Sequence, residues 1–148
     1  MRRWFTCACG WVRPRGQKPL DLVLFFDGEC GLCQALVQVV LAADLEPRFK
    51  FSPLQGALAA RILTPEQTAQ MTSIVLLRDG AVLVKSEAVL ELGRQLGGVW
   101  RLAGILGAVP RPIRDFAYDL VARNRYRWFG RKETCRLPTP SERARFIP

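Results

Sequence analysis

Apolar residues first gather in a short run at residues 20–26, which an Asp-Gly pair closes. A compact run with a β-branched residue and two aromatic residues before such a pair is typical of a buried strand that ends in a turn. Over residues 32–43 the apolar positions recur every three or four residues, which is the period of an amphipathic helix. The pattern therefore predicts a strand and then a helix that starts next to Cys30, with Pro47 as a barrier beyond its end.

Up to residue 96 the chain continues to alternate short apolar runs with helical periods. Thr64, followed by a proline and then Gln67, marks a helix start. An Asp-Gly pair between two β-rich runs indicates a hairpin, and two glycines end the helix that follows it. The predicted elements are a strand at 49–52, a helix at 53–63, a helix from Thr64, strands at 73–77 and 82–85, and a helix at 86–96 that Ser86 opens.

With the helices at 53–63 and from Thr64 taken together as one helical connection, the chain order is β-α-β-α-β-β-α, which is the order of the thioredoxin fold. Beyond them, residues 99–109 predict a short apolar helix, and a second amphipathic helix follows. The apolar positions of that second helix are Ile113, Phe116, Ala117, Leu120 and Val121. We therefore expect an irregular basic leader at residues 1–19 and an α/β, thioredoxin-like domain at residues 20–148, with a helical C-terminal extension from about residue 99.

The chain has 148 residues, of which 49% are apolar, and this suffices for one domain with its own core. None of its apolar runs approaches the ~20 residues that a membrane-spanning helix needs. Its first residues lack the continuous apolar stretch and the cleavage site of a signal peptide. These features predict a cytoplasmic protein without a transmembrane segment.

The net charge is +9 and histidine is absent, so the surface stays cationic over the physiological pH range and favours acidic partners. Much of the excess of Lys and Arg over Asp and Glu lies near the C-terminus, where the basic residues alternate with Tyr118, Tyr126, Trp128 and Phe129. A solvated basic helix is the simplest explanation. The alternative is a module that binds nucleic acid or an anionic membrane surface. Because no Gly-rich phosphate loop or RNA-binding signature accompanies the stretch, we expect no nucleic-acid partner.

The chain has five cysteines, an odd number that does not suit the disulfide framework of a small secreted domain. The absence of histidine also excludes Cys-His nucleophile pairs, Ser-His-Asp triads and zinc sites that use imidazole. Thiol chemistry is what remains. Two of the cysteines, Cys30 and Cys33, form a Cys-x-x-Cys motif at the start of a predicted helix.

The position of Cys30 and Cys33 suits redox chemistry. Their spacing in the first helical turn places both thiols on one face, and the unpaired N–H groups and positive dipole of a helix start favour a thiolate. Cys30 lies nearest the start of the helix, so we expect its thiolate to be stabilised most. We also expect Cys30 to be the more exposed of the two thiols. In the predicted mechanism Cys30 attacks a substrate disulfide, and Cys33 resolves the mixed disulfide that results.

Two acidic residues, Asp27 and Glu29, lie beside Cys30 in the sequence, and negative charge raises a thiol pKa. Asp27 has two interpretations. It is either a turn residue or helix cap, or a buried carboxylate that accepts the proton of Cys33 during resolution. Glu29 is interpreted as a favourable charge in the first helical turn.

The segment DGECGLC at residues 27–33, directly after VLFF, resembles the signature of the DCC family, which is named for one Asp and two Cys at this spacing. Residues 51–55, 86–96 and 118–135 also resemble later motifs of that family. The resemblance implies a thioredoxin-like fold and a thiol-disulfide oxidoreductase of the protein-disulfide reductase type, with no cofactor. Its implied partners are a disulfide-containing protein or small thiol as substrate and an electron donor that the sequence does not identify.

Four more residues are candidates for a role. Thr72 aligns with the position where thioredoxins carry a cis-proline, so we expect a different substrate groove there. Cys135 belongs to the family's pattern; we favour a small buried apolar residue, and a third redox thiol is the alternative. Cys7 and Cys9 lie outside the resemblance. Together with the Cys-x-x-Cys pair they would complete a four-thiolate zinc site, which is the main rival to redox chemistry, although we expect no bound metal.

Overall fold

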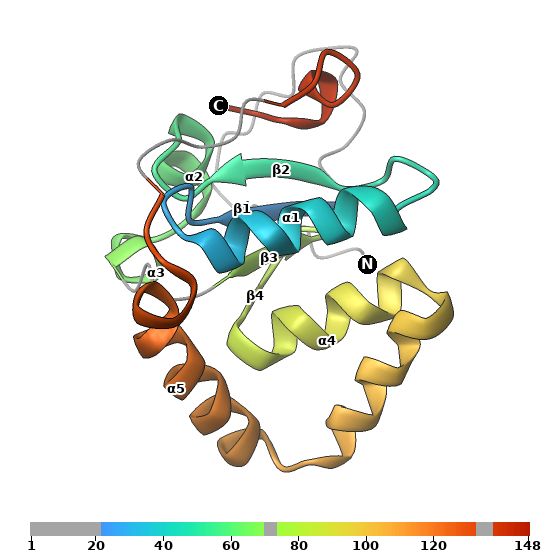
Figure 1. Cartoon of the computed structure of the whole chain (residues 1–148), viewed down its shortest axis with the longest axis vertical. Helices are drawn as coiled ribbons and strands as arrows, with labels where there is room; N and C mark the ends of the chain where they lie inside the picture. Colours follow the sequence, from blue (N-terminus) through green and yellow to red (C-terminus); the bar gives the residue numbers. More distant parts are fainter. Residues whose placement is uncertain (1–21, 70–73, 133–137) are drawn as a thin grey trace, which may run out of the picture.

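The computed structural model describes residues 22–69, 74–132 and 138–148, in which helices cover both faces of a four-stranded sheet (Figure 1). The predicted leader lies outside these residues. The elements, with η for a 3₁₀ helix, are β1 (Leu22–Phe26), α1 (Gly31–Ala43), β2 (Lys50–Pro53), α2 (Ala57–Ile62), α3 (Pro65–Ala69), β3 (Val75–Arg78), β4 (Ala81–Val84), α4 (Lys85–Leu96), η1 (Gly98–Ala108), α5 (Arg111–Phe129) and η2 (Arg143–Arg145).

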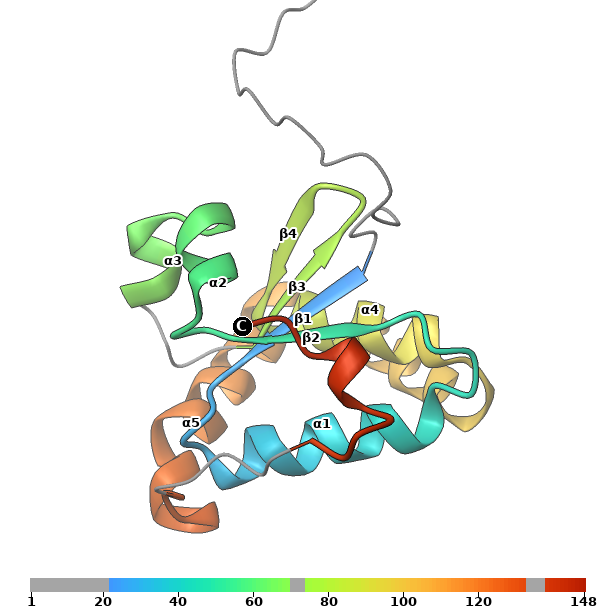
Figure 2. The same ribbon diagram turned by 90° about the horizontal axis from the view of Figure 1, so that it is seen from above.

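The strands lie in the order β2-β1-β3-β4. β1 is parallel to β2 and antiparallel to β3, which pairs in turn with β4. Figure 2 shows α1 and α4 on one side of the sheet and the short helices α2 and α3 on the other. A parallel β1-α1-β2 unit continued by an antiparallel hairpin and a helix is the predicted architecture, so the α/β fold class is confirmed.

The central strand β1 joins two apolar clusters, because the side chains of a strand point alternately to its two faces. Leu24 and Phe26 pack with residues of α1 and α4 in the first cluster. Val23 and Phe25 pack with residues of α2 in the second. All five residues of β1 are buried, so the strand is held on both faces where the chain leaves it for the Cys-x-x-Cys segment.

Two local motifs have the geometry that the sequence predicts. In the β3–β4 hairpin, Asp79 and Gly80 have φ angles of 48° and 86°, the positive values that a type I′ turn requires. At the start of α3, the Gln67 N–H donates to Thr64 Oγ1 at 3.3 Å and the Thr64 N–H donates to Gln67 Oε1 at 2.9 Å. This capping box begins α3 where the sequence places it.

Two predicted boundaries are wrong. The helix expected at 53–63 is confined to Ala57–Ile62, because Pro53 ends β2 and Gly56 takes the N-cap position. Ser86 does not cap the helix after the hairpin. α4 already begins at Lys85, and the Ser86 hydroxyl donates instead to the Asp115 carboxylate of α5. This bond ties α4 to the C-terminal extension.

The end of the chain covers the free edge of β2. The Ile147 N–H donates to Phe51 O at 2.8 Å, and the rings of Phe146 and Phe51 stack with their centroids 5.3 Å apart. An edge strand has unpaired backbone groups, and this segment occupies part of them. The sequence did not predict this contact, because the segment is too short to show a period.

Residues 98–129, which comprise η1 and α5 and which we call the arch, extend away from the sheet beyond α4 (Figure 1). The two helices occur as predicted, the first as a 3₁₀ helix. No residue of η1 is buried, and the buried residues of α5 are Ala122 and Arg125. The predicted apolar face of α5 is therefore turned outward, and Phe116 on it is 72% exposed.

Candidate active site

Cys30 and Cys33 lie at the start of α1, directly after the turn that follows β1. Cys30 is the N-cap residue with an extended backbone (φ −88°, ψ 121°), and Cys33 is in the first turn of α1. Both thiols are free, and the two side chains are close enough to hydrogen-bond. Burial and the neighbouring Cys30 raise the pKa of Cys33 to about 12, against the smaller effects of a backbone hydrogen bond from Asp27 and the charge of Arg125. Cys33 is therefore a protonated thiol at neutral pH.

The expectation that Cys30 is the more exposed thiol is wrong. Cys30 is 0% exposed and Cys33 is 3% exposed. The helix start alone would leave Cys30 open to solvent. What covers it is a segment about a hundred residues later in the chain, just after α5.

Residues 130–132, which we call the covering segment, lie across the start of α1. Arg131 forms an antiparallel bridge with Cys30, the Lys132 N–H donates to Glu29 O at 2.8 Å, and the Gly31 N–H donates to Gly130 O at 3.4 Å. The prediction of Glu29 as a charge in the first helical turn is wrong, because Glu29 precedes the N-cap residue Cys30. Its side chain instead forms an exposed ion pair with Arg131, which holds this segment.

The close approach depends on a glycine in the Cys-x-x-Cys motif. A Cβ atom at Gly31 would lie 2.5 Å from Phe129 O, a distance that no side chain tolerates. A Cβ at Gly28 would meet its nearest neighbour at 3.9 Å, which is ordinary contact. The glycine between the cysteines therefore makes room for the backbone that buries Cys30.

Asp27 is buried at the end of β1 and accepts hydrogen bonds on both carboxylate oxygens. Oδ1 accepts from the Glu29 N–H at 3.0 Å and from Gln55 Nε2 at 3.1 Å. Oδ2 accepts from Arg125 at 2.7 Å and from the Tyr126 hydroxyl. The carboxylate thus joins the chain after β1, the turn after β2 and the end of α5.

Burial raises the pKa of Asp27, but the hydrogen bonds from Tyr126, Glu29 and Gln55 and the charge of Arg125 outweigh it, so the net pKa is lowered. A carboxylate stabilised in this way is a weak base. The geometry therefore favours the interpretation of Asp27 as a turn residue, without a capping bond to α1, over its interpretation as the acceptor of the Cys33 proton.

Arg125 brings a buried positive charge to the thiols. It is 4% exposed, and its guanidinium pairs with Asp27 and lies 4.6 Å from the ring centroid of Tyr126. Burial lowers the pKa of Arg125, but negative charge on Cys33, Tyr126, Asp27 and Cys30 outweighs it and the net pKa is raised. The same attraction opposes the rise in the pKa of Cys33.

Sequence reasoning did not assign a role to Arg125, Tyr126 or Gln55, although all three lie in stretches that resemble the DCC motifs. One signal was available for Arg125. It follows Ala122 by three residues and so lies on the same, buried side of α5, where an arginine needs a buried partner.

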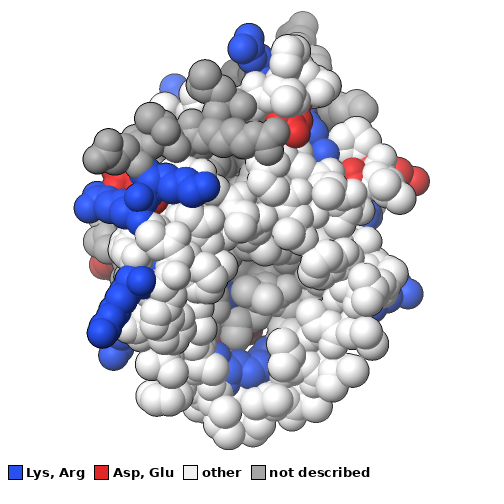
Figure 3. Space-filling model, in the orientation of Figure 1, with Lys and Arg blue, Asp and Glu red and all other residues white. Residues whose placement is uncertain are grey.

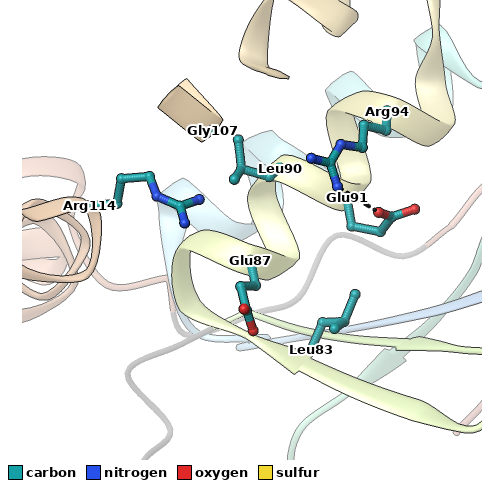
Figure 4. A pocket seen from close by; sticks show the side chains of 7 residues that line it. All are labelled: Leu83, Glu87, Leu90, Glu91, Arg94, Gly107 and Arg114. Atoms are coloured by element: carbon teal, nitrogen blue, oxygen red, sulfur yellow. Dashed lines mark ion pairs between the residues drawn. The ribbon is translucent and has the colours of Figure 1, made fainter. Parts of the chain in front are cut away.

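The remaining candidates lie outside the described residues, namely Thr72, Cys135, Cys7 and Cys9. Within residues 22–69, 74–132 and 138–148, no group of three or more metal-ligating side chains occurs. A cavity of about 230 Å³ lies between α4 and the arch, and its lining residues do not include Cys30 or Cys33 (Figure 4). In the same described part of the chain, no helix is long and apolar enough to cross a membrane.

The sheet order and the cysteine pair at the start of the helix after β1 define a thioredoxin-like protein. A family model described as "DCC1-like thiol-disulfide oxidoreductase" matches residues 24–131, and the chain belongs to this family. This confirms the resemblance seen in the sequence, and it supports thiol-disulfide oxidoreductase chemistry in general.

Two relatives extend the comparison. "Uncharacterized protein YuxK" of Bacillus subtilis (strain 168) is 41% identical over 128 residues, which cover 85% of this chain and 93% of that protein. "DCC family protein At1g52590, chloroplastic" of Arabidopsis thaliana is 35% identical over 118 residues, which cover 78% of this chain and 69% of that protein. No solved structure matches the chain.

Proposed function

We propose that the protein is a thiol-disulfide oxidoreductase of the protein-disulfide reductase type in which Cys30 and Cys33 are the redox couple. The observation that supports this best is the pair of adjacent free thiols at a helix start, beside the buried cation Arg125. Both the helix start and the cation stabilise negative charge on sulfur. A thiolate is the form that attacks disulfides.

The reaction takes two thiol-disulfide exchanges. The Cys30 thiolate attacks one sulfur of a substrate disulfide, which forms a mixed disulfide and releases the other substrate sulfur as a thiolate. Cys33 then loses its proton and attacks Cys30 Sγ, which forms the Cys30–Cys33 disulfide and releases the second substrate sulfur. The substrate gains two electrons and the protein loses two. A dithiol or other thiol donor returns the protein to its reduced form.

Cys33 serves better as the resolving thiol than as the attacking one, because a pKa of about 12 keeps it protonated until the second step. We propose that the departing substrate thiolate takes up this proton. An ordinary thiolate, with a pKa of ~8.5, is a far stronger base than the Asp27 carboxylate, whose pKa is lowered. Asp27 then acts by holding Arg125 in place.

Access to Cys30 requires the covering segment to move, since its backbone now occupies the edge formed by Glu29 and Gly31. An extended peptide that carries a disulfide could pair with the same backbone groups once they are vacated. We therefore propose a disulfide-containing protein as the substrate, with a small disulfide as the alternative. The cytoplasm remains the predicted location.

The test is a redox titration of the full chain. Protein is equilibrated in glutathione buffers of graded potential, free thiols are trapped with a mass-shifting alkylator, and peptide mass spectrometry locates them. We expect Cys30 and Cys33 to change together as one two-electron couple, and the midpoint potential gives the preferred direction of the reaction.

Cys30→Ser and Cys33→Ser are the controls, and each should abolish the two-electron transition. Metal content is measured on the same preparation. Independent or absent oxidation of the two thiols would contradict the proposal. Stoichiometric zinc that is lost when Cys7 and Cys9 are replaced would establish the four-thiolate site instead.

A further inference from the structure

The arch carries an apolar surface that the proposed redox chemistry does not use. Ile113, Phe116 and Leu120 of α5 are 59%, 72% and 50% exposed. On η1, Val99 and Ile105 are 70% and 68% exposed. In the view of Figure 3, the part of the surface that the arch forms has almost no acidic residues. A contiguous exposed apolar surface on a folded domain marks a binding site.

The outward face of α5 follows from the helical period. An α-helix turns by about 100° per residue, so Ile113, Phe116 and Leu120 form one stripe along the helix. Ala122 and Arg125, the buried residues of α5, lie on the opposite side against the domain. The chain's own core therefore does not cover the stripe, and a partner is needed to bury it.

Arginines border this stripe. Arg123 and Arg127 follow Leu120 on the flank where Phe116 lies; both are exposed, and neither forms an ion pair within the described residues. Arg114, nearer the other flank, is turned into the cavity between α4 and the arch (Figure 4). Arg123 and Arg127 thus lie beside Phe116, the most exposed apolar side chain of α5, where they would meet negative charge on the same partner.

We propose that the arch binds the surface of an anionic lipid membrane, with α5 lying in the plane of the interface. An apolar stripe with arginines along its edge is the pattern of interfacial helices, whose apolar face enters the lipid to a depth of about 5–10 Å. A second copy of the chain fits less well, because two chains of charge +9 repel each other. Nucleic acid fits less well, because aliphatic side chains such as Ile113 and Leu120 offer no stacking surface for bases.

This orientation would bring the thiols to the membrane. Ala122 and Arg125 lie on the domain side of α5, and Arg125 contacts Asp27 beside the cysteines. A helix with its side chains is about 10 Å across, so the redox site would lie about that far from the lipid surface. The binding itself does not depend on the thiol chemistry, whereas a membrane-associated disulfide substrate would rest on the proposed function.

Co-sedimentation of the full chain with lipid vesicles tests the inference. One set of vesicles is phosphatidylcholine alone, and the other contains equal parts of phosphatidylcholine and phosphatidylglycerol. We expect binding to the anionic vesicles only, weakening as salt rises. Replacing Arg123 and Arg127 together with Gln should weaken binding at least tenfold, since each basic residue near an anionic surface contributes a factor of about five.

The apolar contribution is tested with the triple variant I113S/F116S/L120S. It should lose vesicle binding but keep the wild-type rate of Cys30 alkylation, which shows that the domain is folded. Leu45→Ser is the matched control, because Leu45 is 91% exposed and lies outside the arch; it should bind as the wild type does. Absence of binding to anionic vesicles at low salt, or unchanged binding by the triple variant, would overturn the inference. A wild-type dimer in light scattering that is absent in the triple variant would also overturn the inference, since the arch would then bind a second copy of the chain.

Discussion

At the scale of single residues, the site depends on a buried ion pair. Asp27 is 2% exposed and Arg125 is 4% exposed, so each charge has given up most of its water and depends on the other. Removing one partner of such a pair leaves an uncompensated buried charge, which costs more than the pair itself contributes.

Asp27→Asn should therefore destabilise the protein by about 3 kcal/mol at neutral pH, because the amide carries no charge to balance Arg125. The pKa of Asp27 is lower in the folded protein than the ordinary 3.8, so its stabilising effect is complete above 3.8 and is lost as the pH falls through the lower, folded value. Urea unfolding of the variant and the wild type at neutral and acidic pH measures the difference. The difference in unfolding free energy between the two proteins should become smaller only at acidic pH. A difference that stays constant would show that Asp27 acts without its charge.

Arg125→Gln tests the effect of the buried cation on the thiols. With the positive charge removed, the rate of Cys30 alkylation at neutral pH should fall about tenfold, because the cation attracts the negative charge that forms on sulfur during the attack. Arg125→Lys should restore part of the rate because it restores the charge. Arg123→Gln removes an exposed arginine of the same helix and is the matched control. An alkylation rate that does not change in Arg125→Gln would mean that Arg125 only supports the fold.

Sequence reasoning found the thiols and Asp27 because they form one short contiguous motif. It did not find Arg125 or Tyr126, which reach the site from α5, about a hundred residues away in sequence. Nor did it predict the burial of Cys30, because the covering segment has no local pattern and becomes visible only when the chain is folded.

At the scale of secondary structure, the sequence predicted the elements better than the surfaces on which they pack. The strand β1, the helix α1 and the hairpin at Asp79-Gly80 follow from local periods and turn residues. The period of α5 was equally clear, yet its apolar face is the exposed one. Periodicity identifies an apolar face but not its partner, and here the buried side is chosen by Ala122 and by the ion pair of Arg125.

Gly31→Ala should separate the start of α1 from the covering segment, because its Cβ would lie 2.5 Å from Phe129 O. We expect Cys30 to be alkylated about tenfold faster and the domain to be less stable, although alanine suits a helix better than glycine by about 1 kcal/mol. Alkylation mass spectrometry and urea unfolding measure the two effects.

Gly28→Ala is the control for this variant, since its Cβ would have room. It should change neither the rate nor the stability appreciably. If Gly31→Ala leaves Cys30 as unreactive as in the wild type, the covering segment is not what shields the thiol.

At the scale of the whole molecule, the question is how a thiol with no exposed surface reacts. The covering segment is attached to the start of α1 by two backbone hydrogen bonds, one of them long at 3.4 Å, and by an exposed ion pair. Such hydrogen bonds contribute about 1 kcal/mol each, whereas a domain of this size unfolds with a free energy of ~5–15 kcal/mol. Local opening at Cys30 should therefore be far more frequent than global unfolding.

This difference predicts how each thiol responds to denaturant. In Cys33→Ser, alkylation of Cys30 should be almost independent of urea below the unfolding transition, because moving the short covering segment exposes little surface. In Cys30→Ser, alkylation of Cys33, which packs in the first cluster with Val37 and Val40 of its own helix, should rise with urea almost as steeply as unfolding itself. If the Cys30 rate also rises with that slope, the covering segment opens only with the whole domain. The chain would then need a partner that exposes Cys30 before any disulfide could be exchanged.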